Sequence, residues 1–237
     1  MISVCLAAYE DDVYLEDQIV SILDQLNSDD EIIISDDSLT KRVYEVCRKI
    51  NDNKIKYIKG PREGVIKNFE NALKNSSGEI IFLSDQDDIW LKDKVYDCVN
   101  SLKKYDLVLT NAIVVDENLD IIDELLFKKD LKYLNIFSTI CKNKFIGCCM
   151  AFNRKILDES LPFPVNIPMH DWWIGLIGLS KGKVFYNHQP YIKYRRHQHV
   201  LTNTQGKSRF KIITRILFRL KLIKSLLLTI FKDMKSN

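Results

Sequence analysis

The sequence predicts an α/β fold in which a mostly parallel central sheet is flanked by helices. In the first 104 residues, apolar runs with strand character alternate with segments whose apolar residues recur at helical spacing. This alternation is typical of parallel sheets covered on both faces. Acidic or polar loops at 9–12, 35–38 and 84–88 follow three of the strand-like runs. Ligands bind at the carboxyl ends of strands in such sheets, so these loops form the candidate site.

Each expected element follows from a local pattern, in chain order. The apolar run at 2–8 suits a strand buried on both faces, and apolar residues at helical spacing follow from Leu15 to Leu26. The alternation continues with strands at 31–35, 54–59 and 79–84 and helices at 39–50 and 65–73. After residue 104 we expect strands at 106–116, 119–123, 145–153 and 183–197, the last broken near Pro190, and helices within 131–145 and at 169–182. Gly147 marks a bulge or a close backbone approach.

The chain length, the composition and the cysteine spacing limit the class of protein. With 237 residues, 46% hydrophobic and 28% charged, the chain suits a folded protein with a proper core. The six cysteines show no C-x-x-C spacing, which favours buried, reduced thiols in the cytoplasm. The N-terminus lacks the pattern of a signal peptide, and no apolar run reaches the roughly 20 residues of a spanning helix. We expect a cytoplasmic protein, with peripheral attachment to the inner face of the cell membrane as a further option.

The C-terminal part of the chain is strongly basic. Residues 172–232 carry 13 Lys or Arg and no Asp or Glu, whereas residues 1–171 have a net charge of −10. This asymmetry indicates an anionic partner: a nucleotide diphosphate, lipid headgroups or nucleic acid. Within 207–232 one helical stripe is basic (Lys211, Arg215 and Arg219) and another is apolar (Ile212, Ile213, Ile216, Leu217, Leu220 and Leu227). Such a helix either lies in an anionic membrane interface or packs on the domain or a second copy.

Three carboxylates stand close together in the stretch FLSDQDDIW, residues 82–90. Asp85, Asp87 and Asp88 repel one another unless a positive charge compensates them. One of them could cap a helix beginning near Leu91, but a cap uses only one side chain. Mg²⁺ and Mn²⁺ collect oxygen ligands, and Mg²⁺ usually takes one or two carboxylates together with substrate phosphates. The loop therefore predicts a divalent cation and a phosphate-bearing ligand.

Five motifs in a fixed order carry a family resemblance. They are SVCLAAYEDDVYLEDQIVSILDQ, ISDDS, GVIKNFENAL followed by SGEIIFLSDQDDIW, GCCMAFNRKIL and HDWW. Together they resemble the inverting glycosyltransferases of the GT-A fold, in the large bacterial family that includes rhamnosyltransferases. The resemblance covers about residues 2–205. It implies a Rossmann-like GT-A domain at 1–205, with a donor half at about 1–110 and an acceptor half at about 111–205, and a basic amphipathic helical tail at 206–237.

The resemblance implies a nucleotide-sugar donor, dTDP-rhamnose or a UDP-hexose, bound by the N-terminal half. Asp36 would accept a hydrogen bond from the pyrimidine N3–H, and Asp85 and Asp87 would hold Mn²⁺ or Mg²⁺ against the diphosphate. The residues that it places at the donor are Ala8, Tyr9, Glu10, Asp36, Asn68, Asp85 and Gln86. The residues alone leave other readings open: a turn for Asp36, a packed aromatic for Tyr9 and a plain helix start for Asn68.

The resemblance also places a base in the motif HDWW. An inverting transfer needs a base for the acceptor hydroxyl and an electrophile for the leaving group. Asp171 matches that base, and burial beside two tryptophans should raise its proton affinity. The alternative is a capping aspartate before two core tryptophans. The residues expected at the acceptor are His170, Trp172, Trp173 and Asp88.

The segment YRRHQH, residues 194–199, brings four cationic or titratable side chains together after a strand. By resemblance Arg195 and Arg196 would contact the diphosphate, where a cation stabilises departing charge, and His197 would ligate the metal. The segment departs from the frequent family form YRQHG at Arg196 and His199, so the contacting residue stays open. A solvated basic loop is the alternative.

The implied function is a metal-dependent inverting glycosyltransferase that acts on a cell-surface polysaccharide or lipid-linked saccharide. No nucleic-acid partner is expected, and a homodimer is an option. A Mg²⁺-dependent sugar nucleotidyltransferase is a rival, but such enzymes usually carry a basic, Gly-rich loop after the first strand, and AAYEDD is acidic and lacks glycine. A membrane- or nucleic-acid-binding module led by the tail would leave the acidic loops unexplained, and nucleic-acid binding would weaken steeply with salt.

Overall fold

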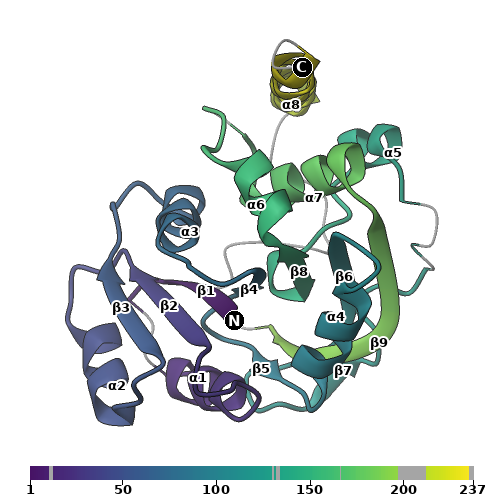
Figure 1. Ribbon diagram of the computed structural model, residues 1–237. Coiled ribbons are helices and arrows are strands. Elements are labelled where there is room, and N and C mark those ends of the chain that lie inside the picture. Colours follow the sequence, from purple (N-terminus) through teal and green to yellow (C-terminus); the bar gives the residue numbers. More distant parts are fainter. Residues whose placement is uncertain (11–12, 130, 132–133, 166, 197–211, 235–237) are drawn as a thin grey trace.

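The computed structural model describes residues 1–10, 13–129, 131, 134–165, 167–196 and 212–234 (Figure 1). Within these residues, nine strands form one sheet in the order β3-β2-β1-β4-β8-β6-β9-β5, and β7 pairs with β6. One continuous apolar core runs from the strands of the N-terminal half to the C-terminal helix, where Leu222 and Leu226 join it.

The N-terminal half of the sheet is parallel. Strands β1 (Ile2–Ala8), β2 (Glu31–Asp36), β3 (Ile55–Lys59) and β4 (Ile80–Ser84) pair only in the parallel sense with one another. Nearly every residue of β1, β2 and β4 is buried, as expected for apolar runs covered on both faces. The predicted strands at 2–8, 31–35, 54–59 and 79–84 are confirmed.

Three helices cover the two faces of this parallel half. Helices α1 (Leu15–Leu23) and α2 (Arg42–Ile50) lie on one side, and α3 (Val65–Lys74) packs on β1 and β2 from the other side (Figure 1). This arrangement follows from right-handed crossovers, because the chain reverses its direction across the sheet between β3 and β4.

The C-terminal half of the sheet is mixed. Strand β8 (Met150–Asn153) runs antiparallel to β4 and to β6 (Leu107–Val115), and β9 (Val184–Arg195) runs parallel to β6. The short strands β5 (Ile89–Trp90) and β7 (Ile121–Asp123) pair antiparallel with β9 and β6. The predicted break at Pro190 is wrong, because β9 continues through this residue and absorbs it as a register shift opposite Asn111.

The remaining helices follow β5 along the chain. They are α4 (Lys94–Leu102), α5 (Ile136–Cys141), α6 (Arg154–Ser160), α7 (His170–Lys181) and α8 (Ile212–Met234). The helix expected within 131–145 is thus only α5, and the strand expected at 145–153 is a 3-10 turn, η1 (Gly147–Cys149), followed by β8. No helix among the described residues is long and apolar enough to cross a membrane.

Candidate active site

Three acidic loops meet at one edge of the sheet, as their positions in the sequence predict. The parallel register places Ala8 beside Asp36 and Leu6 beside Ser84, so β1, β2 and β4 end at the same edge, with β4 two residues shorter than β1. The loops then bond directly: the Tyr9 N–H donates to Gln86 Oε1 at 2.7 Å, and Gln86 Nε2 donates to the Tyr9 carbonyl at 3.2 Å. The Gln86 side chain therefore joins the acidic loop to the backbone of the first loop at Tyr9. Tyr9 itself stays 57% exposed.

The carboxylates of Glu10 and Asp36 build the second loop. Glu10 accepts hydrogen bonds from the Leu39 N–H at 2.6 Å and from Thr40 Oγ1 at 2.8 Å, and these bonds lower the pKa of Glu10. Asp36 accepts hydrogen bonds from the Ser38 N–H at 2.9 Å and from the Tyr57 hydroxyl at 2.8 Å. The bond to the Ser38 N–H forms a turn, which is the alternative that the sequence left open for Asp36. Each carboxylate oxygen has a second lone pair, so Asp36 retains capacity for a nucleobase N–H.

Asn68 closes the floor beneath these loops. Its Nδ2 donates to the Ala8 carbonyl at 3.0 Å, and its buried Oδ1 accepts from no group among the described residues. A Cβ atom on Gly60 would lie 2.5 Å from this oxygen and 2.2 Å from Asp37 Oδ1, so only glycine allows the chain to approach here. Ala8 itself is fully buried, so the expectation that its side chain lines a base pocket is corrected: Ala8 contributes a carbonyl to the floor.

The acidic loop forms a compact group of potential metal ligands. The carboxylates of Asp85 and Asp88 and the Cys148 thiol place one ligand atom each within 4.8 Å of one another. Burial raises the pKa of Asp85 to about 7, with further contributions from the charges of Asp87 and Asp171. Burial and the charges of Asp87 and Asp85 likewise raise the pKa of Asp88 well above its usual range. A half-buried and a buried acid that disfavour ionisation at such proximity fit a divalent cation.

Asp88 joins Asp85 in this group, although its spacing in the sequence favoured Asp87 as the partner. The chain bends at Gln86 and Asp87, which brings Asp88 back beside Asp85. Asp88 is fully buried, with Oδ1 accepting from the Arg195 N–H at 3.0 Å and Oδ2 without a partner among the described residues. Direct contact of Asp88 with an acceptor sugar does not fit this burial. An orphaned buried oxygen does fit a cation, whereas the soft Cys148 thiol suits Mg²⁺ or Mn²⁺ poorly.

Arg195 supports the acidic loop from the end of β9. Its Nε donates to the Asp87 carbonyl at 2.8 Å and its Nη1 to the Glu117 carbonyl at 2.7 Å. The guanidinium stacks on Tyr14 at 4.2 Å, and Nη2 has no acceptor among the described residues. This buried cation with an unused donor is suited to an anionic oxygen. Arg196 instead stacks over Tyr194 at 5.3 Å, and the predicted ligand His197 lies outside the described residues.

Asp171 lies beside this acidic group, in the first turn of α7. The carboxylate is 7% exposed and accepts from Asn143 Nδ2 at 3.1 Å. Burial raises the pKa of Asp171 to about 7, against the opposing effect of its hydrogen bonds. A Cβ on Gly147 would lie 3.9 Å from Asp171 Cβ, and the next residue, Cys148, belongs to the Asp85 and Asp88 group. One peptide unit therefore borders both Asp171 and the Asp85 and Asp88 group.

The aromatic neighbours of Asp171 divide between core and surface. Trp173 is 1% exposed and donates from Nε1 to the Ser160 carbonyl at 2.9 Å, so its expected place at the acceptor is corrected to a place in the core. Trp172 is half-buried and donates to the Thr139 carbonyl at 2.7 Å. His170 is buried against Phe69, with ring centroids 3.9 Å apart. Burial lowers the pKa of His170 to about 3, so its imidazole is neutral and cannot serve as a cation.

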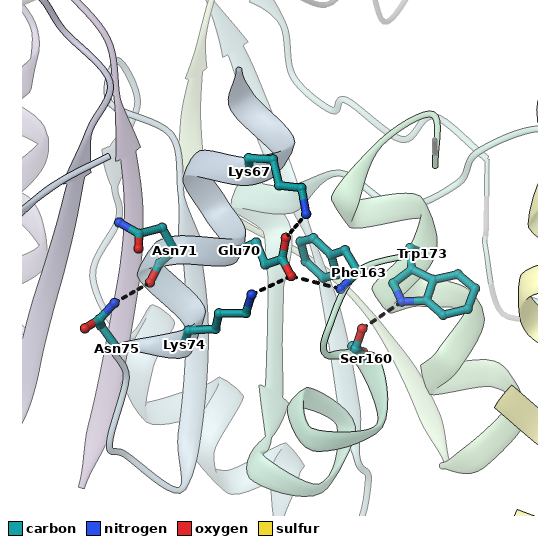
Figure 2. Close-up of polar contacts among 8 residues, drawn as sticks. All are labelled: Lys67, Glu70, Asn71, Lys74, Asn75, Ser160, Phe163 and Trp173. Atoms are coloured by element: carbon teal, nitrogen blue, oxygen red, sulfur yellow. Dashed lines mark hydrogen bonds and ion pairs between the residues drawn. The ribbon is translucent and has the colours of Figure 1, made fainter. Parts of the chain in front are cut away.

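A buried glutamate on α3 holds the segment that leads into α7 (Figure 2). Glu70 accepts from Lys67 at 2.5 Å, from Lys74 at 2.8 Å and from the Phe163 N–H at 3.2 Å. Burial alone would raise the pKa of Glu70, but these three partners outweigh it and lower the pKa. The sequence contains a signal for these ion pairs that our sequence prediction did not include. Lys67 and Lys74 stand three and four residues from Glu70, the spacing at which side chains meet on a helix.

Comparisons with known proteins identify the family of the chain. The family described as Glycosyl transferase family 2 matches residues 3–161. The dTDP-rhamnosyl transferase RfbG of Shigella flexneri is 25% identical over 233 residues, which cover 87% of this chain and 77% of that protein. An Escherichia coli protein, UDP-Glc:alpha-D-GlcNAc-diphosphoundecaprenol beta-1,3-glucosyltransferase WfgD, is 23% identical over 87% of this chain and 81% of its own length.

Solved structures share the fold. S. aureus TarS 1-349 in complex with UDP-GlcNAc has a TM-score of 0.68 at 18% identity, covering 84% of this chain and 59% of the TarS chain. The mannosyltransferase PcManGT from Pyrobaculum calidifontis, in complex with GDP-Man and Mn²⁺, has a TM-score of 0.57 at 17% identity and is covered to 54%. The chain thus spans little more than half of these two structures, with the GT-A sheet and helices in common. On the match over residues 3–161, the protein belongs to glycosyl transferase family 2.

Proposed function

We propose that this glycosyltransferase moves one sugar from a pyrimidine nucleotide donor, dTDP-rhamnose or a UDP-hexose, onto a saccharide acceptor with inversion at the anomeric carbon. The observation that carries the proposal is the buried carboxylate of Asp171, whose pKa is raised to about 7, beside the Asp85 and Asp88 pair. The names of the Shigella and Escherichia relatives support these donors, and the name of the latter supports a lipid-linked acceptor.

The residues divide the reaction between two centres. At the acceptor, the Asp171 carboxylate takes the proton of the attacking hydroxyl while the new bond forms between its oxygen and the anomeric carbon. The bond between the anomeric carbon and the diphosphate oxygen breaks on the opposite face, and the nucleoside diphosphate leaves with the electron pair. The unused Nη2 donor of Arg195 is placed to stabilise an anionic oxygen there.

Mg²⁺ or Mn²⁺ fits the Asp85 and Asp88 pair, which disfavours ionisation without a cation and offers an unpartnered buried oxygen. When bound, such an ion would neutralise charge on the leaving diphosphate. Asp87 lies partly exposed beside the pair and is a further candidate ligand, as the sequence suggested. We assign the binding of the donor nucleotide to Tyr9, Gln86, Asp36 and Asn68. The exposed Tyr9 ring is available to stack on the nucleobase.

Donor hydrolysis and transfer test the proposal directly. The purified protein is incubated with dTDP- and UDP-sugars, with and without Mn²⁺, and the released nucleoside diphosphate is measured. Asp171→Asn should lower transfer at least about 100-fold because general base catalysis is lost, while leaving thermal stabilisation by UDP or dTDP with Mn²⁺ in place. Asp85→Asn should remove that stabilisation. Asp158→Asn, at an exposed carboxylate on α6, is the matched control. Undiminished transfer in Asp171→Asn would exclude this residue as the base.

A further inference from the structure

Helix α8 has one face docked on the protein and the opposite face uncovered. It contacts α5 and α7, burying Leu222 and Leu226 fully or nearly so (Figure 1). Arg219 Nη2 anchors it further by donating to the Cys141 carbonyl at 2.6 Å. The apolar side chains that remain between 37% and 72% exposed are Ile213, Ile216, Leu217, Leu220, Ile223, Leu227 and Leu228.

These exposed side chains share one side of the helix. At 3.6 residues per turn they fall within an arc of about 140°, and the two buried leucines lie on the opposite side. We call this set of seven the outer face of α8. Scattered surface leucines are ordinary, but a continuous apolar stripe of this kind marks a surface that meets another apolar phase. Helix packing within the domain therefore explains only half of the apolar pattern of α8.

The charges beside the outer face select its partner. Lys224 lies within the arc and Lys221 at its edge, and both are exposed. Residues 207–232 contain eight Lys or Arg and no acidic residue. A second copy packed outer face to outer face would bring Lys221 and Lys224 against their counterparts, whereas anionic headgroups would neutralise them. Long lysine side chains can lie along an apolar surface while the ammonium group reaches the headgroups.

We propose that the outer face of α8 is a membrane-docking surface that lies flat in an anionic lipid interface. As described, residues 212–234 of α8 are not apolar enough to cross a bilayer, whereas one apolar face with basic residues suits an interfacial helix. The docking also orients the reaction centre. Helix α8 packs on α7, which begins with His170 and Asp171, and on α5, whose Thr139 carbonyl binds Trp172. A lipid-linked acceptor would then approach Asp171 from the membrane side, a step that rests on the proposed function.

Vesicle sedimentation tests the docking without any sugar chemistry. The full chain is mixed with vesicles of phosphatidylcholine alone, or of equal parts phosphatidylcholine and phosphatidylglycerol. We expect binding to the anionic vesicles, at least about tenfold weaker binding after Leu217→Glu with Leu220→Glu, and weakening by high salt. Lys221→Ser with Lys224→Ser should weaken binding more than Tyr96→Glu, a control at an exposed aromatic residue on α4. Far-UV circular dichroism and thermal melting establish that each variant is folded.

Three outcomes would overturn the docking surface. The first is equal binding to both vesicle types, and the second is unchanged binding of the Leu217 and Leu220 variant. The third is a dimer of the unchanged chain in analytical ultracentrifugation that becomes a monomer in this variant. The last result would assign the outer face to a second copy. Donor hydrolysis is measured on the same samples. If vesicles bind and the donor is untouched, the proposed function fails alone; if the donor is hydrolysed and vesicles do not bind, the docking fails alone.

Discussion

Replacing Glu70 with glutamine tests how firmly α3 holds the segment that leads to Asp171. The change keeps the size of the side chain but removes the charge that Lys67, Lys74 and the Phe163 N–H share. The lysine side chains are 41% and 52% exposed, so each ion pair contributes at most about 1 kcal/mol after screening. The hydrogen bond from Phe163 becomes a neutral one and loses about 1 kcal/mol. We expect the free energy of unfolding to fall by about 1–3 kcal/mol.

The pH dependence gives this prediction its sign. The pKa of Glu70 is lowered in the fold, so its charge stabilises the protein above the unfolded pKa. The difference between Glu70→Gln and the unchanged chain should be full at neutral pH and should shrink as the pH falls through the lowered value. For a chain of this size about 1 kcal/mol corresponds to about 2–4 °C in Tm, which calorimetry resolves.

A matched ion pair supplies the control for this experiment. Glu16 on α1 binds Lys49 at 2.7 Å, but the two side chains are 42% and 69% exposed. Glu16→Gln should therefore change the stability by less than about 0.5 kcal/mol. The reasoning is refuted if both variants melt alike, or if the effect of Glu70→Gln is independent of pH.

Three further predictions concern the site and its core. Asp88→Asn should raise the metal-free Tm at pH 8 yet weaken Mn²⁺ binding. The raised pKa of the buried Asp88 carboxyl makes it neutral in acid, and its ionisation destabilises the fold as the pH rises. An unchanged Mn²⁺ affinity would contradict this prediction. The donor-saturated rate should rise with pH through about 7 and then level, because Asp171 acts deprotonated and its pKa is raised to about 7; a flat profile would argue against the base. Gly175→Ala places a Cβ 2.2 Å from the Phe145 ring and should destabilise the protein by about 1–3 kcal/mol in chemical denaturation, with partial rescue by Phe145→Leu.

The parallel half was readable from the sequence because each of its strands is a local pattern. A run such as residues 2–8 must be buried on both faces, and the carboxyl ends of such strands must meet at one edge. Helix α6 was also readable but was missed: Asn153 caps it by accepting from the Ile156 N–H at 3.3 Å, and asparagine is among the preferred capping residues.

The rest depended on bends that spacing cannot reveal. Residues 147–149 are apolar and suit a strand, yet they turn in a 3-10 helix beside Asp171. The same limit applies to the acidic loop, where the bend at Gln86 and Asp87 brings Asp88 beside Asp85. Of two adjacent tryptophans, only the fold decides that Trp173 enters the core while Trp172 stays half-buried.

Because Gly147 borders Asp171 and Cys148 adjoins Asp85 and Asp88, a single turn of backbone sets the spacing between Asp171 and the Asp85 and Asp88 pair. That turn contacts β4 and β6 inside the molecule. A peripheral element such as β7, which among the described strands pairs only with β6, can then be remodelled without disturbing this spacing. Such an enzyme can acquire a new acceptor through changes at its rim while its reaction geometry is inherited intact.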